Sequence, residues 1–279
     1  MKKILVPTDF SFCADNAMNI AIGFAKKMNA EIHLLHFTSI PVDWLNLRDR
    51  KKMYPDVTER INECRQLLKQ KVEDCKQKGI EAAYYIEYNE SYQNILDHTT
   101  AHLINIVVMG SHGTSGVKGI LMGSNAQKVV RLSSVPLLVV KPETTELLPE
   151  SITIVSDFPW EDHEPGHKDA FEKIVRLSKE LNFPIQLLFV NTPGGFTTSK
   201  ELNYRIVPYL ESAALKEEPF VINAANLEKG ISVFLESHPN TIVGMITHGE
   251  TGFNRIIRGS QVESIVNHLK SPILTIKMT

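Results

Sequence analysis

Two copies of one sequence plan are the feature that most restricts the fold of this chain. Four motifs occur in the same order in both halves, at offsets of 148, 153, 136 and 136 residues. The pairs are Asp9-Phe10 with Asp157-Phe158, Ile32-x-Leu34-Leu35 with Ile185-x-Leu187-Leu188, Met109-x-x-His112-Gly113 with Met245-x-x-His248-Gly249, and Val135-Pro136-Leu137-Leu138 with Ser271-Pro272-Ile273-Leu274. Because the order is kept while the gaps change, insertions and deletions fall between the repeated elements. We therefore predict a tandem duplication, with domains over residues 1–143 and 144–279.

Apolar runs alternate with helical periods inside the first copy. The runs predict strands near residues 3–7, 31–37, 81–87, 104–109 and 135–140. Apolar residues at spacings of three and four predict two helices, one through residues 14–28 and one through residues 61–75. Alternating strands and helices favour a parallel sheet that is covered on both faces. With right-handed crossovers, each copy is predicted to be a doubly wound five-stranded α/β sheet.

The differences in spacing indicate where the copies diverge and how they meet. The second copy gains five residues around 161–169 and then loses 17, most of which we expect in the segment that matches residues 39–55. The linker over residues 142–150 is short and acidic and has no glycine or serine tract, so we expect the domains to pack together. A bare apolar edge strand is an association hazard. We therefore expect the fifth strands, residues 137–140 and 273–276, to pair or pack across a pseudo-two-fold axis.

Composition excludes several classes of partner. The chain has 30 basic and 32 acidic residues, which gives no long-range attraction to nucleic acid or to an anionic membrane. Its apolar runs are too short to span a bilayer, and no signal-peptide core follows the first residues. The three cysteines have no CxxC spacing, so a disulfide framework is not expected. These features predict a cytoplasmic protein without a nucleic-acid or membrane partner.

A glycine-rich segment follows the fourth predicted strand. Gly110-Ser111-His112-Gly113 is followed nine residues later by Gly123-Ser124, directly before a helix-like segment over residues 125–132. Glycine lets backbone amides approach a ligand, and a helix start offers unpaired N–H groups to phosphate. The segment therefore predicts a nucleotide-phosphate site, with an ordinary surface loop as the alternative.

The pattern Gly-x-x-Gly-x9-Gly-Ser, together with Ile4-Leu5-Val6-Pro7-Thr8-Asp9-Phe10-Ser11, resembles the universal stress protein family, and more narrowly its ATP-binding branch. The resemblance covers almost the whole chain in two copies. It implies an adenine nucleotide alpha hydrolase-like fold with strand order 3-2-1-4-5. Ligands in such sheets bind where the strand order reverses, here between strands one and four. The ligand that the resemblance implies is ATP, with or without Mg²⁺.

The resemblance also implies the residues of that site. Asp9 would bind adenosine, the backbone of Phe37 would bracket adenine, and Gly110 would leave room for ribose; the alternatives are a helix cap for Asp9 and plain core for Phe37. The phosphates would meet amides near the glycines and the Ser124 hydroxyl. The full set is Pro7, Thr8, Asp9, Phe37, Met109, Gly110, Gly113, Gly123, Ser124, Asn125 and Ala126.

Neither catalytic nor metal-ligating residues are predicted. The chain contains no P-loop, no nucleophile elbow and no paired carboxylates beside the glycine segment. Two His-x-x-x-His spacings occur, His98 with His102 and His163 with His167, but neither carries an HExxH signature. Pro165-Gly166 also interrupts any helix between the second pair. Slow hydrolysis of a Mg²⁺-bound triphosphate needs no dedicated base and stays open.

The second copy departs from the pattern at two positions. Ile246 stands where the first copy has Gly110, and Val155 stands where it has Pro7. A β-branched side chain would occupy the space next to ribose, so we predict one nucleotide per chain, bound in the first domain. The leading function is a stress-response regulator or sensor that binds ATP. The alternatives are a nucleotide-free interaction scaffold and an enzyme of the α-hydrolase type; a homodimer of the whole chain also stays open.

Overall fold

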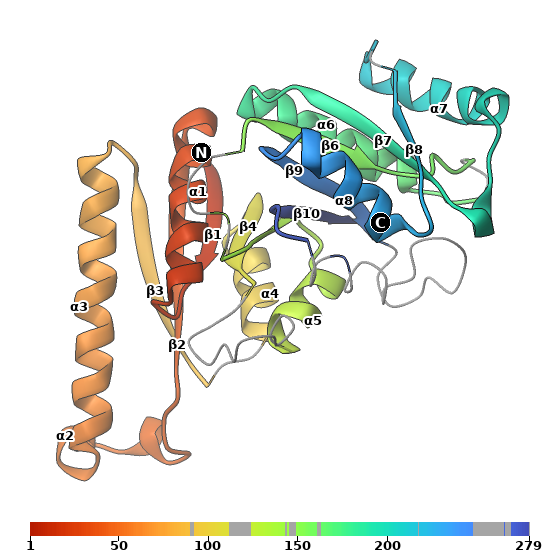
Figure 1. Ribbon diagram of the computed structural model, residues 1–279. Helices are drawn as coiled ribbons and strands as arrows, with labels where there is room; N and C mark the ends of the chain where they lie inside the picture. Colours follow the sequence, from red (N-terminus) through yellow and green to blue (C-terminus); the bar gives the residue numbers. More distant parts are fainter. Residues whose placement is uncertain are drawn as a thin grey trace.

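The computed structural model describes most of the chain. The described residues are 1–89, 92–111, 124–142, 144, 149–160, 163–216, 218–247, 265 and 269–278, with the backbone alone at 124 and 125. Ten strands among them form one sheet (Figure 1). The strands are β1 (Lys2–Pro7), β2 (Ala30–Thr38), β3 (Ala82–Tyr88), β4 (Ile106–Gly110), β5 (Leu137–Val140), β6 (Ser151–Val155), β7 (Ile185–Asn191), β8 (Phe220–Asn223), β9 (Thr241–Thr247) and β10 (Ile273–Lys277).

Each half of the sheet has the predicted architecture. The order β3-β2-β1-β4-β5 in the first half and β8-β7-β6-β9-β10 in the second both correspond to 3-2-1-4-5. Neighbouring strands within each half are parallel. This is the doubly wound α/β fold that the alternation of elements predicts. The described helices are α1 (Phe12–Met28), α2 (Arg50–Met53), α3 (Pro55–Gln77), α4 (Tyr92–Ala101), α5 (Ser124–Leu132), α6 (His167–Leu181), α7 (Ser199–Ala213) and α8 (Leu227–Ser237).

The two fifth strands join the halves into a single sheet. β5 pairs with β10 in antiparallel register, with Leu138 opposite Leu274. Both side chains are buried, with exposed fractions of 0% and 1%. Each strand thereby covers the apolar edge that the other would leave bare. The expected pairing of the fifth strands is present, and it merges what the sequence predicted as two five-stranded sheets.

Buried apolar side chains cover both faces of the sheet. One core cluster contains residues of α1, α3, α6 and α7 together with strand residues from both halves. The other contains residues of α4, α5 and α8. The first cluster includes Val140 of β5 and Ile276 of β10, so it continues across the boundary between the halves. The tandem copies therefore share one hydrophobic core on this face of the sheet.

Local backbone chemistry explains where the elements begin and end. The Ser11 hydroxyl accepts a hydrogen bond from the Ala14 amide and caps α1, and Asn29 in the left-handed region ends that helix. The fourth strand begins at residue 106 rather than at the predicted 104, because the Ile104 amide donates to the Thr99 carbonyl and closes the end of α4. The fifth strand begins after Pro136, which has no amide hydrogen to donate to a sheet.

The loss of 17 residues in the second copy is divided between a connection and a helix. Sixteen residues separate β2 from α3, whereas seven separate β7 from α7. The helix itself shortens from 23 residues in α3 to 15 in α7. The connection therefore accounts for only about half of the loss, less than the sequence predicted, because a helix can lose whole turns and keep its buried face.

The cysteines are free thiols. Cys64 and Cys75 lie on α3, as predicted, and Cys13 lies on α1. Burial is the main cause that raises the pKa of the Cys64 and Cys75 thiols. Both are therefore protonated at neutral pH, which makes them weak nucleophiles.

Candidate functional site

The crevice predicted from the strand order lies where β1 and β4 end. The two strands are parallel neighbours, with Ile4 beside Ile106 and Leu5 beside Val107. The chain passes from β1 to β2 on one side and reaches β4 on the other side. Crossover connections leave in opposite directions at such a switch point, and this leaves a gap above the carboxyl ends of the strands. The segment after Pro7 and the segment after Gly110 both begin at this edge.

A tight turn follows β1. The Thr8 hydroxyl accepts from the Phe10 amide at 3.1 Å, and the Asp9 carboxylate accepts from the Ser11 amide at 3.1 Å. Phe10 adopts a positive φ of 62°, which these two hydrogen bonds stabilise. Asp9 is half-buried and stabilises the turn before α1, whereas the helix cap that was its alternative role is made by Ser11.

His36 is a residue of this site that the sequence analysis did not identify. Its Nδ1 donates to the Thr8 carbonyl oxygen at 2.8 Å, and its ring lies 4.6 Å from the Phe10 ring. The Thr8 amide in turn donates to the Leu35 carbonyl at 2.8 Å. These contacts fix the turn after β1 against β2. His36 precedes Phe37 on the strand already assigned to the site, but the sequence contains no signal for the contact with Thr8.

Gly110 packs closely against the start of α1. A Cβ atom at this position would lie 3.0 Å from the Cys13 carbonyl carbon and 3.1 Å from its oxygen. The Cys13 thiol donates to the Val140 carbonyl at 3.3 Å, and the Ser111 amide donates to the same oxygen at 2.9 Å. The bare α-carbon thus lets the start of α1 approach the ends of β4 and β5. This close approach explains the glycine without reference to a ligand.

The remaining predicted residues divide into core positions and positions outside the described residues. Met109 and Ala126 are buried, and the half-buried Phe37 packs against the same core cluster. The backbone places Ser124 at the start of α5, as the helix-like segment predicted. Gly113 and Gly123, and the side chains of Ser124 and Asn125, lie outside the described residues.

In the second half, side chains are buried at the positions that correspond to Pro7 and Gly110. Val155 and Ile246 are buried, with exposed fractions of 1% and 2%. The Ser156 hydroxyl, which accepts from the Phe158 amide, lies 3.3 Å from His167 Nε2. The Tyr209 hydroxyl lies 3.0 Å from His167 Nδ1. Three polar groups thus link the turn after β6 to α6 and α7.

A later helix start accompanies the change to Ile246. The helix α1 begins five residues after β1 ends, whereas α6 begins twelve residues after β6 ends. Among the described residues of the second copy, the first helix after β6 therefore begins too late to match the position of Cys13 on α1. Pro165-Gly166 also ends any helix before His167, because Gly166 is the N-cap of α6. His163 and His167 consequently do not share a helix face.

The other histidine pair does come together. The rings of His98 and His102 stack with centroids 4.1 Å apart, and His33 of β2 joins them. One nitrogen from each of the three side chains lies within 4.8 Å of the other two. The spacing of histidines in the sequence indicates only pairs within one helix. His33 is 65 residues away from His98, and nothing in the local sequence pattern indicates that they meet.

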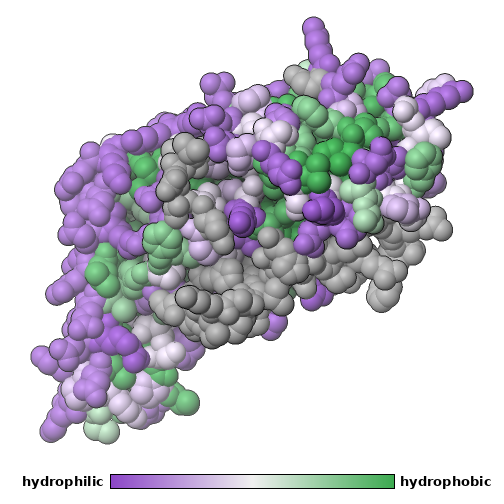
Figure 2. Space-filling view, in the orientation of Figure 1, coloured by the Kyte–Doolittle hydropathy of each residue, from purple (hydrophilic) through white to green (hydrophobic). Residues whose placement is uncertain are grey.

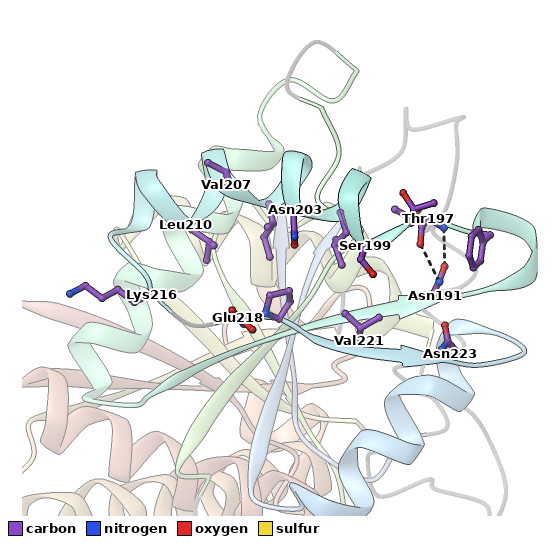
Figure 3. Close-up of a pocket in the computed structure, with 15 residues that line it drawn as sticks. Asn191, Thr197, Ser199, Asn203, Val207, Leu210, Lys216, Glu218, Val221 and Asn223 are labelled. Atoms are coloured by element: carbon purple, nitrogen blue, oxygen red, sulfur yellow. Dashed lines mark hydrogen bonds between the residues drawn. The ribbon is translucent and has the colours of Figure 1, made fainter.

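A separate cavity of about 780 Å³ lies in the second half, between α7 and the edge strand β8 (Figure 3). The amide of Asn191 donates to the Thr197 carbonyl and accepts from the Thr197 amide at one end. Val207 and Val221 line it and are 44% and 51% exposed. Figure 2 shows hydrophobic surface on this end of the molecule. The cavity lies away from β1 and β4 and has no counterpart in the predicted site.

Among the helices that the structure describes, none combines the length and the apolar character needed to cross a membrane.

Comparison with known proteins assigns the family. A family model described as the universal stress protein family matches residues 1–141. The chain belongs to the universal stress protein family. Universal stress protein YxiE of Bacillus subtilis (strain 168) is 30% identical over 145 residues, which cover 50% of this chain and 98% of that protein. The family match therefore rests on the first copy, which contains the glycine segment.

Solved structures extend the similarity of fold to the second copy. A universal stress protein from Archaeoglobus fulgidus DSM 4304 matches with a TM-score of 0.70 and 23% identity, over 99% of this chain and 98% of that chain. At this identity the match shows the fold alone. A universal stress protein solved in complex with cAMP matches 50% of this chain, with 19% identity and a TM-score of 0.40.

Proposed function

We propose that this universal stress protein binds one adenine nucleotide per chain, with ATP as the leading ligand, and acts as a cytoplasmic stress-response regulator or sensor. The nucleotide would bind in the first of two domains, residues 1–143, above the ends of β1 and β4. The observation that supports this most is the family match over residues 1–141, which contain the glycine segment. The two halves also differ beside the switch point. The first copy keeps glycine beside its switch point, whereas the second has the buried Ile246 there.

Each group of the site would have a separate role. The Asp9 carboxylate is half-buried at the crevice, where it is able to accept hydrogen bonds from adenosine in addition to the Ser11 amide. The start of α5 at Ser124 would supply unpaired amides and positive dipole character to the phosphates. Gly113 and Gly123 would let the backbone approach them. Mg²⁺ would bind through phosphate oxygens, because it prefers oxygen ligands.

A nucleotide-free interaction scaffold is the second candidate. The contact between Gly110 and Cys13 favours it, since that glycine has a structural reason of its own. In the scaffold the glycine segment would shape a surface for a protein partner. The two candidates differ in whether purified protein retains adenine nucleotide.

Calorimetric titration of the full chain with ATP tests the proposal. We expect one ATP per chain, and adenine absorbance in the supernatant when freshly purified protein is heated. The Asp9→Asn variant keeps an acceptor for the Ser11 amide but removes the charge. Hydrogen bonds to charged groups are stronger than neutral ones by about 1 kcal/mol, so affinity should fall about fivefold to tenfold.

The matched control is Asp157→Asn, the same change at the repeated position. This variant should bind ATP as the unmodified chain does. Two nucleotides per chain would contradict the assignment to one domain. A lack of binding, with no released nucleotide, would favour the scaffold. An equal loss of ATP affinity in Asp9→Asn and Asp157→Asn would show that the effect does not distinguish the two domains, so neither carboxylate would identify the site.

A further inference from the structure

Three histidines from distant parts of the chain meet between the sheet and α4. His33 projects from β2 and is 1% exposed. His98 lies in the last turns of α4 and is 5% exposed, and the half-buried His102 follows one turn later. The Tyr85 ring of β3 lies 4.6 Å from His98 and 4.8 Å from His102. The cluster is thus built from the sheet and a helix, not from a surface loop.

The spacing of the nitrogen atoms suits a tetrahedral metal ion. His33 Nδ1 and His98 Nε2 are 3.3 Å apart. Two imidazole nitrogens bound to zinc at about 2.0–2.1 Å in a tetrahedral arrangement are separated by roughly 3.3 Å. One nitrogen of His102 lies within 4.8 Å of both. It therefore needs a shift of about 1.5 Å, which a half-buried side chain at the end of a helix makes by changing its rotamer.

The Glu31 carboxylate lies beside the most buried of the three rings. His33 Nε2 lies 3.4 Å from Glu31 Oε1, outside good hydrogen-bond geometry, and is a buried polar atom without a hydrogen-bond partner. A proton on Nε2 facing this carboxylate leaves the lone pair of Nδ1 directed at His98. Histidines that bind metals commonly donate their second nitrogen to a carboxylate in this way.

Burial keeps His33 and His98 in the neutral form that binds a metal. Burial lowers the pKa of His33 and lowers the pKa of His98 to about 4, so both are neutral at pH 7. Lys3 and His102 lower both pKa values further, whereas Glu31 raises that of His33. A bound cation would be repelled by Lys3 and attracted by Glu31. Neutral imidazole is the ligand form of histidine.

We propose that His33, His98 and His102 form a binding site for a divalent transition-metal ion of the zinc class. The fourth coordination position would face the half-buried side of His102 and hold water. Lys3, which lowers the pKa of His33 and His98, donates its amide to Asn105 just before β4. The site therefore lies near the amino end of that strand. The nucleotide crevice lies at the opposite, carboxyl end. A metal here would tie α4 to β2 independently of any nucleotide.

The test is a titration of the untagged, chelator-treated full chain with Zn²⁺. We expect saturable binding of one ion per chain, and Mg²⁺ in excess should not compete, because it prefers oxygen ligands. Co²⁺ in place of Zn²⁺ should give the intense visible absorption of a four-coordinate site. Loss of outer-shell partners costs about 10–100-fold in metal affinity, so His102→Gln should weaken binding at least 100-fold and Glu31→Gln about tenfold.

The matched control is His163→Gln, which changes an exposed histidine outside the cluster and should leave Zn²⁺ affinity unchanged. His102 is half-buried, so its replacement should leave the fold intact, and circular dichroism checks this. Binding that persists in His102→Gln and in His33→Gln would overturn the proposal, as would six-coordinate Co²⁺ spectra. Absence of saturable Zn²⁺ binding by the unmodified chain would overturn it as well.

Discussion

Adding one methyl group at each of two strand glycines should change stability in opposite directions. In Gly110→Ala the new Cβ would lie 3.0 Å from the carbonyl carbon and from the sulfur of Cys13. Carbon atoms pack best at about 3.5–4.0 Å. Because two of the nearest atoms belong to the backbone of α1, the helix or β4 has to move by several tenths of an ångström. In Gly244→Ala the nearest atoms are 3.5 Å away, in ordinary contact.

The expected free energies follow from these distances. Overpacking a core typically costs about 1–3 kcal/mol, and replacing glycine by alanine returns about 0.4–1 kcal/mol by restricting the unfolded chain. Gly110→Ala should therefore lower the free energy of unfolding by about 1–2 kcal/mol. Gly244→Ala should raise it by about 0.5–1 kcal/mol, since the Ile152 and Ile174 side chains already accommodate the methyl group.

Urea unfolding followed by tryptophan fluorescence measures both changes. Trp44 lies in the first half and Trp160 in the second, so the signal reports on both. The midpoint should fall in Gly110→Ala and rise in Gly244→Ala, with similar slopes. Equal stability of the two variants would refute the packing argument for Gly110. The glycine would then have to be explained by the ligand alone.

Two further predictions concern pH and the boundary between the halves. Burial lowers the pKa of His98 in the folded chain to about 4. Below about pH 6.5 this histidine therefore binds a proton in the unfolded chain but not in the folded chain, and the free energy of unfolding decreases between about pH 6.5 and pH 4. At about 1.36 kcal/mol per pKa unit the loss approaches 3 kcal/mol in metal-free protein. Over that pH range the urea midpoint should fall less steeply in His98→Gln than in the unmodified chain. A pKa near 6.5 for His98, measured by NMR, would contradict the prediction. Leu138→Ala removes a fully buried side chain at the β5–β10 pairing and should cost about 2–5 kcal/mol, with faster amide exchange in both strands. The same change at Leu67, which is 50% exposed, is the control and should cost less than about 1 kcal/mol.

The repeated motifs by themselves determine much of the architecture. Apolar alternation and spacing are local properties, so they predicted the strands and a doubly wound sheet in each half. The strand order 3-2-1-4-5 was implied by the family resemblance. The resemblance to the universal stress proteins rested on the same short segments. The position of the crevice followed from strand order, since ligands bind where that order reverses. Pro165-Gly166 likewise showed that His163 and His167 do not share a helix.

Contacts between distant residues were decided only by the tertiary structure. The sequence shows Gly110 as one glycine of a loop motif, whereas its packing against Cys13 depends on how closely α1 approaches β4. The meeting of His33 with His98 depends on the register of β2 and on the rotation of α4 about its axis. The sequence predicted that β5 and β10 pair or pack, but their antiparallel register, with Leu138 opposite Leu274, is defined only by the structure. Periodicity along a chain states which face of an element is buried, but it contains no information on which residue of another element that face meets.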